Sequence, residues 1–537
     1  MIILHAYHPE VWDAQVKAGF VREGDGIRFC QSLQTDNEVK FNELAAKGGT
    51  LYNICKTENR PFYIDRLQGG SAFQNYVYDE ALLDEYKEML GENFWGFQMH
   101  EWFSNYKTDL ARVAVLKDKD WSAEGIRAEL HRQFPYPFTF IESMNEGEMA
   151  AMPFPESFSQ YLENMGGIYK KRKAYGPLIP CDSFFLTYNF AIQNGARRLL
   201  PEVGAQTPYS HLQISYARGM AKHHGIDFGV YYETWGGSPF STCCYHEDAR
   251  CEWRSKNGVR HSPFAAAGAN GGSSRALQWH IFLYAYLSNA DFLSEEWGLC
   301  NVFENWKTFP ISPYGKVKLD FLAFMKQFPA VGKKLTPVAV VLPRELPVLD
   351  NIKEPNSICG FPVEAGELAF IKNTLKDLFA TPTEMLGNES HSLINSEIPD
   401  AIDILNDDGR AIEGYDYLID LTCSETALEN QKAKRIAAED VTAVLKDSLP
   451  CYVEGGAHFV VNECTEGGYY LSIFNHSGIR RTVADGESIL PEATKALSIT
   501  FKKECTPKVV FGTASLEQDG DLYRLALDGG DFVMIHF

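Results

Sequence analysis

Short β-rich runs alternate with amphipathic helical segments over the first 330 residues, and this alternation constrains the fold more than any other feature. Strands that alternate with helices pair in parallel, through right-handed crossovers. Eight such units over about 300 residues fit a (β/α)8 barrel, or TIM barrel, whose typical size is about 250 residues or more. The eight predicted strands are Ile2–Ala6, Ile27–Gln31, Phe62–Arg66, Phe94–Glu101, Phe138–Ser143, Arg197–Val203, Phe228–Trp235 and Asp291–Trp297.

A ninth apolar run, Ser183–Tyr188, leaves two ways of counting the strands. It ends only nine residues before Arg197, and neighbouring parallel strands need a crossover of about a dozen residues or more. We therefore predict a helix over Asp182–Gly195 and retain the eight strands above. The alternative count drops Ile2–Ala6, keeps Ser183–Tyr188 and shifts every early strand number by one. Between the strands, the clearest predicted helices are Asp79–Leu90, Ser157–Lys173, Ser210–His223 and Ser273–Asn289.

The pattern changes after Gly332, so we predict three domains. We predict that residues 1–332 form the barrel and residues 336–450 a small flavodoxin-like α/β domain. Residues 451–537 are predicted to form a C-terminal β-sandwich, because Gly-rich turns separate the short strands of this part. Neither GxGxxG nor GxxxxGK[ST] occurs in the second domain, so no phosphate-binding loop is predicted there. Its predicted elements are Pro337–Leu342, Gly366–Phe379, Tyr415–Leu421 and Glu425–Leu445, of which the second and fourth are helices. The predicted strands of the third domain are His458–Asn462, Tyr469–Asn475, Leu497–Phe501, Lys508–Phe511, Leu522–Leu527 and Phe532–Phe537.

The net charge of the chain limits the kinds of partner that it is expected to bind. Its 537 residues include 50 Lys or Arg and 71 Asp or Glu, a formal net charge of −21. This excess argues against binding to nucleic acid or to an anionic membrane surface. No run approaches the ~20 apolar residues of a membrane helix, and the N-terminus lacks the basic region of a secretory signal. The 12 cysteines are scattered, which is typical of reduced thiols, so we expect a cytoplasmic protein.

Acidic and aromatic residues gather where the predicted barrel strands end. Barrel enzymes place their active sites at the carboxyl ends of the strands, and carboxylates in a concave mouth are costly unless paired or used. Glycoside hydrolysis needs two carboxylates that flank the scissile bond, and flat aromatic rings stack on sugar faces. Five predicted strands end in Glu, namely Glu101, Glu142, Glu202, Glu233 and Glu295. Nearby are Asp65, Arg66 and His100, and three tryptophans, Trp102, Trp235 and Trp297.

Two motifs carry a resemblance to a known family: FWGFQMHEW around Glu101, and GVYYETWGGSP around Glu233. With the three-domain layout, they resemble the β-galactosidases of glycoside hydrolase family 42. Members of that family combine a barrel, a flavodoxin-like domain that mediates oligomerisation, and a β-sandwich. The resemblance implies an acid/base Glu at the end of strand four and a nucleophile Glu at the end of strand seven. On the preferred strand count these are Glu101 and Glu233.

One departure from the family keeps a second acid/base candidate open. The wider clan has Asn immediately before the acid/base, where it binds the sugar 2-hydroxyl, but this chain has His100 there. An Asn-Glu pair, Asn145-Glu146, follows the end of another predicted strand. On the alternative strand count, Glu142 becomes the strand-four carboxylate. Glu101 and Glu142 both remain candidates.

The resemblance implies a retaining, exo-acting glycosidase that acts on β-linked oligosaccharides without a cofactor, and by analogy a homo-oligomer, a trimer in family 42. Two alternatives stay open: a non-catalytic carbohydrate-binding barrel, and a lyase or metal-dependent isomerase that uses the same Glu residues. On this interpretation the three tryptophans are hydrophobic walls. The residues expected to bind sugar hydroxyls are Asp65, Arg66, His100, Glu202 and Glu295.

A cysteine-rich segment, CCYHEDARC, contains Cys243, Cys244, His246 and Cys251. Thiolates and imidazole at such spacing can hold Zn²⁺. However, adjacent cysteines seldom bind one ion, and a second Cys-x₂-Cys half is absent. We therefore favour a loop with reduced thiols, and a structural metal site at these four residues stays open as the alternative.

Overall fold

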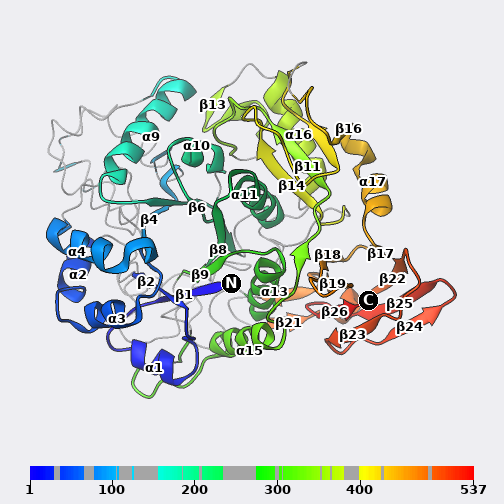
Figure 1. The fold of residues 1–537 in the computed structure, drawn as a ribbon, viewed down its shortest axis with the longest axis horizontal. Coiled ribbons are helices and arrows are strands. Elements are labelled where there is room, and N and C mark those ends of the chain that lie inside the picture. Colours follow the sequence, from blue (N-terminus) through cyan, green and yellow to red (C-terminus); the bar gives the residue numbers. More distant parts are fainter. Residues whose placement is uncertain are drawn as a thin grey trace.

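Most of the chain is described by a computed structural model (Figure 1). The structure describes residues 1–29, 37–65, 78–103, 106–107, 155–183, 186–204, 209–233, 274–296, 302–304, 306–350, 354–362, 366–379, 398–424, 428–481 and 487–537, with positions 122, 124, 125 and 128. Among these residues, no helix is both long enough and apolar enough to span a lipid bilayer.

The first part of the chain is a TIM barrel. Its strands lie in the order β5-β4-β3-β2-β1-β9-β8-β6, and the pairs along this order are parallel. The Leu200 N–H donates to the Pro180 carbonyl (3.2 Å), which links the two ends of this order and nearly closes the barrel. The strands are β1 Ile2–Ala6, β2 Gly26–Phe29, β3 Phe62–Ile64, β4 Phe94–His100, β5 Leu178–Cys181, β6 Arg198–Leu199, β7 Glu202–Gly204, β8 Asp227–Glu233 and β9 Phe292–Glu295.

β6 and β7 are two pieces of one barrel strand. Both pair with β8 in a single register, with Arg198 opposite Asp227 and Glu202 opposite Tyr231. Pro201 lies between the two pieces and has no N–H to donate to a ladder, although its carbonyl still accepts from the Tyr231 N–H (2.9 Å). The barrel therefore has eight strand positions, as predicted.

The preferred count of eight strands is confirmed, but the strand beside β4 is not the one that we predicted. β1 lies between β2 and β9, so the alternative count that omits it is wrong. In the described residues of the segment that begins at Ser183, there is a bridge at Leu186, and helix α10 (Tyr188–Gln193) follows. The strand beside β4 is β5, which we did not predict, because Pro180 in its middle is unusual within a strand. The strand predicted over Phe138–Ser143 lies outside the described residues.

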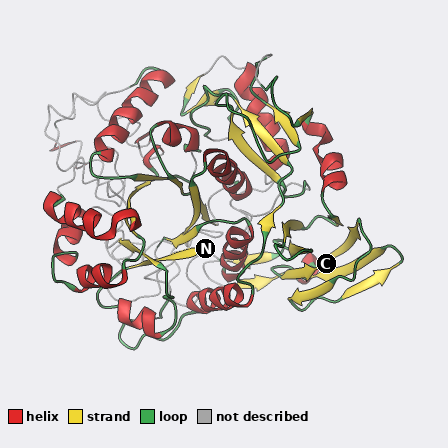
Figure 2. Cartoon of the chain, viewed as in Figure 1, coloured by secondary structure: helices red, strands yellow, loops and turns green. Residues whose placement is uncertain are grey.

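Helices surround the barrel, and the four predicted helices are confirmed (Figure 2). Each of the three that has a polar residue before its first turn is capped: Asp79, Ser157 and Ser274 each accept a hydrogen bond from a backbone N–H three residues later. The helices of this part are α1 Trp12–Lys17, α2 Asn37–Leu44, α3 Thr50–Glu58, α4 Glu80–Leu90, η1 Gly91–Asn93, α9 Phe158–Lys173, α10, α11 Ser210–His224, α13 Arg275–Leu287 and α15 Pro313–Gln327.

A four-stranded parallel sheet follows, in the order β14-β11-β15-β16. The helix predicted over Gly366–Phe379 is confirmed as α16, but the long helix predicted over Glu425–Leu445 is wrong. Residues Lys434–Ile436 instead form the edge strand β16, because pairing with β15 overrides the helix propensity of this Lys- and Ala-rich stretch. The remaining elements are β11 Val338–Leu342, β14 Ile402–Asn406, β15 Tyr417–Asp420, η3 Ala438–Asp440 and α17 Val441–Ser448, with a small hairpin of β12 Ser357–Ile358 and β13 Phe361–Pro362.

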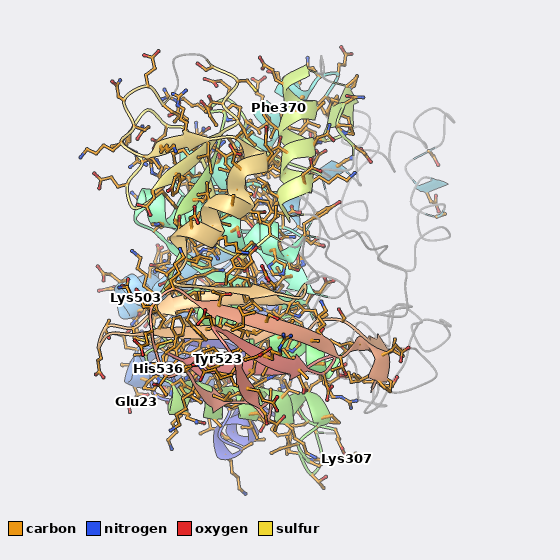
Figure 3. The ribbon with its side chains drawn as sticks, turned by 90° about the vertical axis from the view of Figure 1, so that its right-hand side faces the viewer. Glu23, Lys307, Phe370, Lys503, Tyr523 and His536 are labelled. Carbon is orange, nitrogen blue, oxygen red and sulfur yellow. The ribbon has the colours of Figure 1, made fainter. Side chains whose placement is uncertain are left out.

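The C-terminal part contains two main antiparallel sheets, in the orders β10-β18-β19-β26-β23 and β17-β22-β25-β24. All six strands predicted there are confirmed in position. Figure 3 shows Phe370 of α16 near one end of the molecule, far from Lys503, Tyr523 and His536 of the C-terminal part. The elements are β10 Lys333–Lys334, β17 Cys451–Glu454, β18 His458–Glu463, β19 Tyr469–Phe474, β20 Ile479–Arg481, β21 Glu487–Ile489, η4 Pro491–Ala493, β22 Lys495–Phe501, β23 Lys508–Phe511, β24 Leu516–Asp519, β25 Leu522–Leu527 and β26 Phe532–His536.

One apolar cluster runs through all three parts of the molecule. It includes Tyr216 of α11, Val340 of β11, Ile404 of β14 and Val460 of β18, all buried. Gly219 lets α11 lie directly on β14, because a Cβ at this position would collide with the Ile404 carbonyl. The sheets outside the barrel are therefore packed against the helix that connects β7 to β8.

Candidate active site

Strand alternation decides which residues at the carboxyl ends face the barrel interior, since successive side chains point to opposite faces. On β9, Phe292 belongs to the interior cluster, and the Ser294 hydroxyl bonds to the Tyr63 hydroxyl across the barrel (2.7 Å). Glu296 continues this face. Glu295 lies on the other face, where its carboxylate pairs with Lys318 of α15. The prediction that Glu295 binds substrate is thus corrected: Glu296 is the eighth-strand carboxylate of the mouth.

Four carboxylates and one imidazole meet at the barrel mouth, and we call His100, Glu101, Glu202, Glu233 and Glu296 the mouth cluster. One oxygen each from Glu202, Glu233 and Glu296 lies within 4.8 Å of the others, and all three residues are buried. The His100 Nε2 lies 3.7 Å from both Glu101 Oε2 and Glu202 Oε1, and 3.8 Å from Glu296 Oε1. The ends of β4, β7, β8 and β9 thus bring together residues from distant parts of the sequence.

The imidazole of His100 is held between Gln98 and the carboxylates of the mouth cluster. Gln98, two residues earlier on the same face of β4, has its amide nitrogen 3.1 Å from His100 Nδ1. An amide N–H donates only to an unprotonated Nδ1, and with this hydrogen bond the ring proton is on Nε2. The ring also meets the edge of Tyr231, with centroids 5.5 Å apart. His100 is therefore held so that its Nε2 points into the cluster.

Glu101 has an unusual backbone for a residue with a side chain. Its φ is 45°, in the left-handed region, and this conformation costs on the order of 1 kcal/mol or more. Its N–H donates to the Cys181 carbonyl (2.6 Å), and the Ser183 hydroxyl donates to its Oε1 (3.0 Å). Its side chain is 31% exposed, whereas that of Glu202 is almost fully buried. Of the mouth cluster, Glu101 is the carboxylate with access to water.

Gly204 allows β7 to lie close to β8 beside Glu233. A Cβ at Gly204 would lie 2.8 Å from the Glu233 Cβ, too close for any side chain. Replacement of this glycine would therefore displace Glu233 from the mouth cluster.

A second polar group lies within the barrel interior. Arg28 pairs with Asp65, donates to the Tyr231 hydroxyl (2.7 Å) and donates to the Glu295 carbonyl (2.8 Å). Asp65 is fully buried, so this pair holds β2, β3, β8 and β9 together. The expected role of Asp65 in binding sugar hydroxyls remains a prediction.

Trp102 does not line the mouth. It is 1% exposed and packs among Phe103, Tyr169 and Phe190, with ring centroids 4.8, 5.2 and 5.7 Å away. The left-handed turn at Glu101 ends the strand alternation, so Trp102 enters the core between the barrel and its helices. The prediction that Trp102 forms a sugar-binding wall is thereby corrected.

The structure brings together four predicted site residues, Glu101, His100, Glu202 and Glu233. Sequence reasoning missed Glu296, because alternation places Phe292, Ser294 and Glu296 on one face of the strand but does not say which face points into the barrel. The predicted residues that lie outside the described part are Arg66, Glu142, Trp235, Trp297, Cys243, Cys244, His246 and Cys251.

The mouth cluster suits two kinds of chemistry. Close carboxylates repel one another, so the group favours a shared proton or a bound cation. A shared proton supplies a general acid next to ionised carboxylates. Alternatively, three carboxylates and an imidazole are ligands for a divalent cation such as Mg²⁺ or Mn²⁺. Among the described residues, Cys181 also lies within reach of His100 and Glu202.

These features define the class: a TIM-barrel protein with an acidic site at the carboxyl ends of its strands. No protein-family model matches the chain, and neither does any curated protein. It is similar in structure to an α-L-fucosidase isoenzyme 2 from Paenibacillus thiaminolyticus, with 8% identity over 94% of this chain and 80% of that one, at a TM-score of 0.37. It is also similar to an α-amylase from H. orenii, with 7% identity over 85% and 64% of the two chains, at a TM-score of 0.24. The barrel assignment depends on strand order and pairing, and at such low scores these likenesses add nothing to it.

Proposed function

We propose that the protein is a retaining glycoside hydrolase that removes sugars from the ends of β-linked oligosaccharides. The observation that carries the proposal is the convergence of Glu101, Glu202 and Glu296 on His100 at the barrel mouth, with Glu233 beside Glu202 and Glu296. Retaining hydrolysis requires one carboxylate to attack the sugar and a second to donate a proton. The cluster contains more carboxylates than that, which leaves others to bind hydroxyls.

In the proposed mechanism, Glu233 attacks the anomeric carbon while Glu101 donates a proton to the leaving oxygen. The glycosidic bond breaks and a glycosyl–Glu233 ester forms. Glu101 then takes a proton from water, which hydrolyses the ester and restores both groups. The difference in exposure supports these roles, because the acid/base must meet water whereas the buried nucleophile, Glu233, is shielded from it.

The other members of the mouth cluster would position the sugar. In this proposal Glu202 and Glu296 accept hydrogen bonds from sugar hydroxyls, and the Nε2–H of His100 donates to one. Arg66, Trp235 and Trp297 remain predicted sugar contacts, and Glu142 remains the alternative acid/base. Specificity like that of a β-galactosidase or β-mannosidase, assembly into a trimer and a cytoplasmic location are predictions from the sequence.

A panel of nitrophenyl glycosides tests the proposal. The wild type is expected to hydrolyse at least one β-glycoside, and Glu233→Gln to lose that activity. Azide is expected to restore turnover to Glu233→Ala, because the small anion replaces the missing nucleophile. Glu101→Gln and Glu142→Gln, run in parallel, identify the acid/base. Full activity in Glu233→Gln ends the assignment, and a barrel that sugars stabilise without any hydrolysis indicates a carbohydrate-binding protein.

A metal-dependent sugar isomerase is the second candidate. The observation that favours it is the proximity of oxygens from Glu202, Glu233 and Glu296, which fits one divalent ion. This candidate predicts aldose–ketose conversion that stops on dialysis against EDTA and returns with Mg²⁺ or Mn²⁺. Hydrolysis that is insensitive to EDTA decides for the glycosidase.

A further inference from the structure

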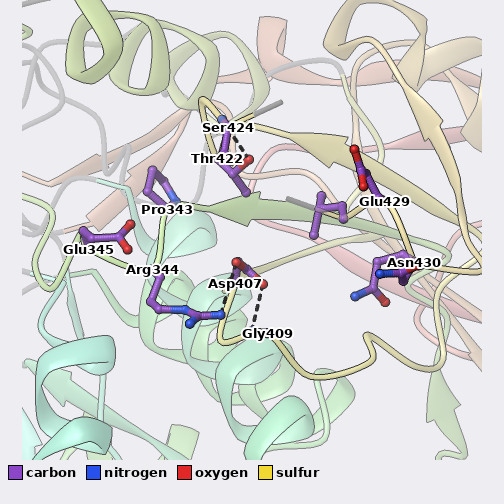
Figure 4. A pocket seen from close by; sticks show the side chains of 11 residues that line it. Pro343, Arg344, Glu345, Asp407, Gly409, Thr422, Ser424, Glu429 and Asn430 are labelled. Carbon is purple, nitrogen blue, oxygen red and sulfur yellow. Dashed lines mark hydrogen bonds and ion pairs between the residues drawn. The ribbon is translucent and has the colours of Figure 1, made fainter. Parts of the chain in front are cut away.

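A polar pocket of about 350 Å³ opens at the carboxyl edge of the parallel sheet, far along the chain from the mouth cluster (Figure 4). The loops after β11, β14 and β15 form its wall. The lining residues are Pro343, Arg344, Glu345, Asp407, Gly409, Thr422, Ser424, Leu428, Glu429, Asn430 and Gln431.

The pocket lies where the strand order reverses direction. From β11 the chain passes to β14 on one side, and then crosses to β15 on the other side of β11. The loops that leave β11 and β15 therefore diverge and leave a crevice between them. In doubly wound sheets, ligands bind in this crevice outside the carboxyl ends of the strands. The volume is within the range of small-molecule sites.

The charges of the lining disfavour an anion. Among the described lining residues, Glu345, Asp407 and Glu429 contribute three carboxylates, whereas Arg344, 3.6 Å from Asp407, is the one cation. The residue after β11 is Pro343, which has no N–H, so this loop does not present the row of backbone donors that a phosphate needs. A phosphate or nucleotide is therefore a poor fit.

The mixture of donors and acceptors indicates a neutral polyol. Arg344 and Asn430 donate, whereas the carboxylates accept. The Thr422 hydroxyl, which donates to Asp420 (2.7 Å) and accepts from the Ser424 N–H (3.4 Å), retains one lone pair that accepts. Each hydroxyl of a sugar both donates and accepts, so a sugar uses both sets. A cationic amine would use the acceptors alone and would leave Arg344 and Asn430 without an acceptor on the ligand.

Contacts with the barrel hold the pocket in place before any ligand arrives. Asn189 of α10 donates to the carbonyls of Arg344 (3.2 Å) and Leu346 (2.9 Å), and Asn406 donates to those of Pro343 (2.7 Å) and Leu346 (3.0 Å). In the loop after β14, Gly409 has a φ of 81°. Such preorganisation lowers the entropy that a ligand must overcome.

Two further interactions fix the loop after β14. The Asp407 carboxylate accepts the N–H of Gly409 (3.0 Å), and the Arg344 guanidinium lies where a Cβ of Gly409 would be. Gln431 joins two loops, since its side chain accepts from the Ile412 N–H (2.7 Å) and donates to the Arg410 carbonyl (3.1 Å).

We propose that this pocket binds a neutral mono- or disaccharide, as a second carbohydrate site separate from the barrel mouth. The inference depends only on the pocket and does not require the barrel to be a glycosidase. Its test therefore uses a measurement that involves no turnover.

Cys423 is a built-in reporter for the pocket. It is exposed and lies between two lining residues, Thr422 and Ser424. Burial, with the carboxylates of Glu367 and Asp420, raises the pKa of Cys423, so alkylation by iodoacetamide is followed at about pH 9. Peptide mass spectrometry measures its rate on the full chain, with Cys505 as the internal control.

The probes are methyl β-D-galactoside, methyl β-D-glucoside, methyl β-D-mannoside and lactose, with putrescine and inorganic phosphate as the cationic and anionic alternatives. At least one sugar is expected to slow alkylation of Cys423 to about half when its concentration equals its dissociation constant, roughly millimolar for a weak site. Cys505 should not change. Protection by putrescine or phosphate alone, or by none of the probes, overturns the proposal.

Variants locate the protection. The exposed pair Glu345→Ala/Glu429→Ala is expected to abolish it, whereas the matched exposed change Glu413→Ala retains it. Glu233→Gln, which alters the barrel mouth, is also expected to retain it. Protection that survives in the double variant, or that disappears in Glu233→Gln, places the sugar elsewhere and overturns the proposal. Loss of hydrolysis without loss of protection affects the proposed function alone.

Discussion

Two buried groups of titratable side chains differ in how closely their members meet. The mouth cluster joins carboxylates to His100 at 3.7–3.8 Å. The second group, which we call the junction cluster, lies where α11 and α13 meet the sheets outside the barrel. Its contacts are 2.8–2.9 Å long, except that between His211 and Asp400, which is 3.5 Å. The junction cluster consists of His211, His280, His458, His476, Lys334 and Asp400.

The two distances indicate two roles. In the junction cluster, Asp400 contacts Lys334 (2.8 Å) and His458 (2.9 Å), and His476 bonds to both His458 and His280. Such direct contacts satisfy buried polar groups and hold elements together. In the mouth cluster, the distances of 3.7–3.8 Å from His100 Nε2 to Glu101, Glu202 and Glu296 exceed a hydrogen bond and leave room for water or a ligand atom. We infer that direct pairing marks the structural cluster and open spacing the functional one.

The largest expected effect is at the junction. Asp400→Asn removes the carboxylate beside buried Lys334, and a buried charge left without its partner costs about 3–5 kcal/mol. The free energy of unfolding, from urea denaturation, is expected to fall by that amount. Asp408→Asn is the matched control at a partly exposed pair with His223, where about 1 kcal/mol or less is expected. Equal losses in the two variants would contradict the assigned role of the junction cluster.

Glu295 and Glu296 are adjacent in the chain, but Glu295 pairs with Lys318 whereas Glu296 belongs to the mouth cluster. Glu296→Gln removes a mouth carboxylate and is expected to lower kcat/KM on the best glycoside about 100-fold, or about 2.7 kcal/mol, with little change in melting temperature. Glu295→Gln breaks the pair with Lys318 and is expected to lower the melting temperature with little change in kcat. The reverse pattern would show that the alternation along β9 was misassigned.

The pH dependence of stability tests the junction histidines. Burial lowers the pKa of His280 to about 4 and that of His458 to about 3, from about 6.5 in an unfolded chain. Between about pH 6.5 and 4 the unfolded chain therefore binds protons that the folded chain does not, so stability falls as the pH falls. Each histidine contributes about 1.4 kcal/mol per pH unit. Urea midpoints measured from pH 7 to 5 are expected to show this decline.

A histidine variant sharpens that measurement. His280→Asn is expected to reduce the slope by one histidine. A slope that His280→Asn does not alter would exclude its protonation as a cause of acid destabilisation.

The smallest expected effect concerns Trp102. As a core residue it should tolerate Trp102→Phe with a loss of about 1–2 kcal/mol of stability and an unchanged KM. If Trp102 contacted sugar, the KM would rise while the melting temperature stayed constant. Kinetics and thermal melting on the same preparation separate the two results.

Most of the barrel was predictable because periodicity is a local property. The alternation of strands and helices located seven of the eight strand positions, and N-cap residues such as Ser157 and Ser274 marked where helices begin. β5 was not predicted, because it contains Pro180 and proline is rare within a strand. The helix predicted over Glu425–Leu445 was wrong because β16 depends on a partner strand, β15, that no local pattern reveals.

The site was only partly predictable for a similar reason. Residue type and strand ends pointed to Glu101, Glu202 and Glu233, which the structure brings together. The choice between Glu295 and Glu296 required the face of β9, which only the contact between Ser294 and Tyr63 establishes. Trp102 was misplaced because the left-handed turn at Glu101 ends the alternation.

The sequence by itself determined the parallel barrel and the acidic character of the strand ends, because these depend on local periodicity and composition. Tertiary structure alone decided which carboxylates share the mouth, that Asp400 meets Lys334 and His458 across the junction, and that a crevice opens between β11 and β15. Those outcomes depend on contacts between residues far apart in the chain. Their distances are set by packing, which no local pattern encodes.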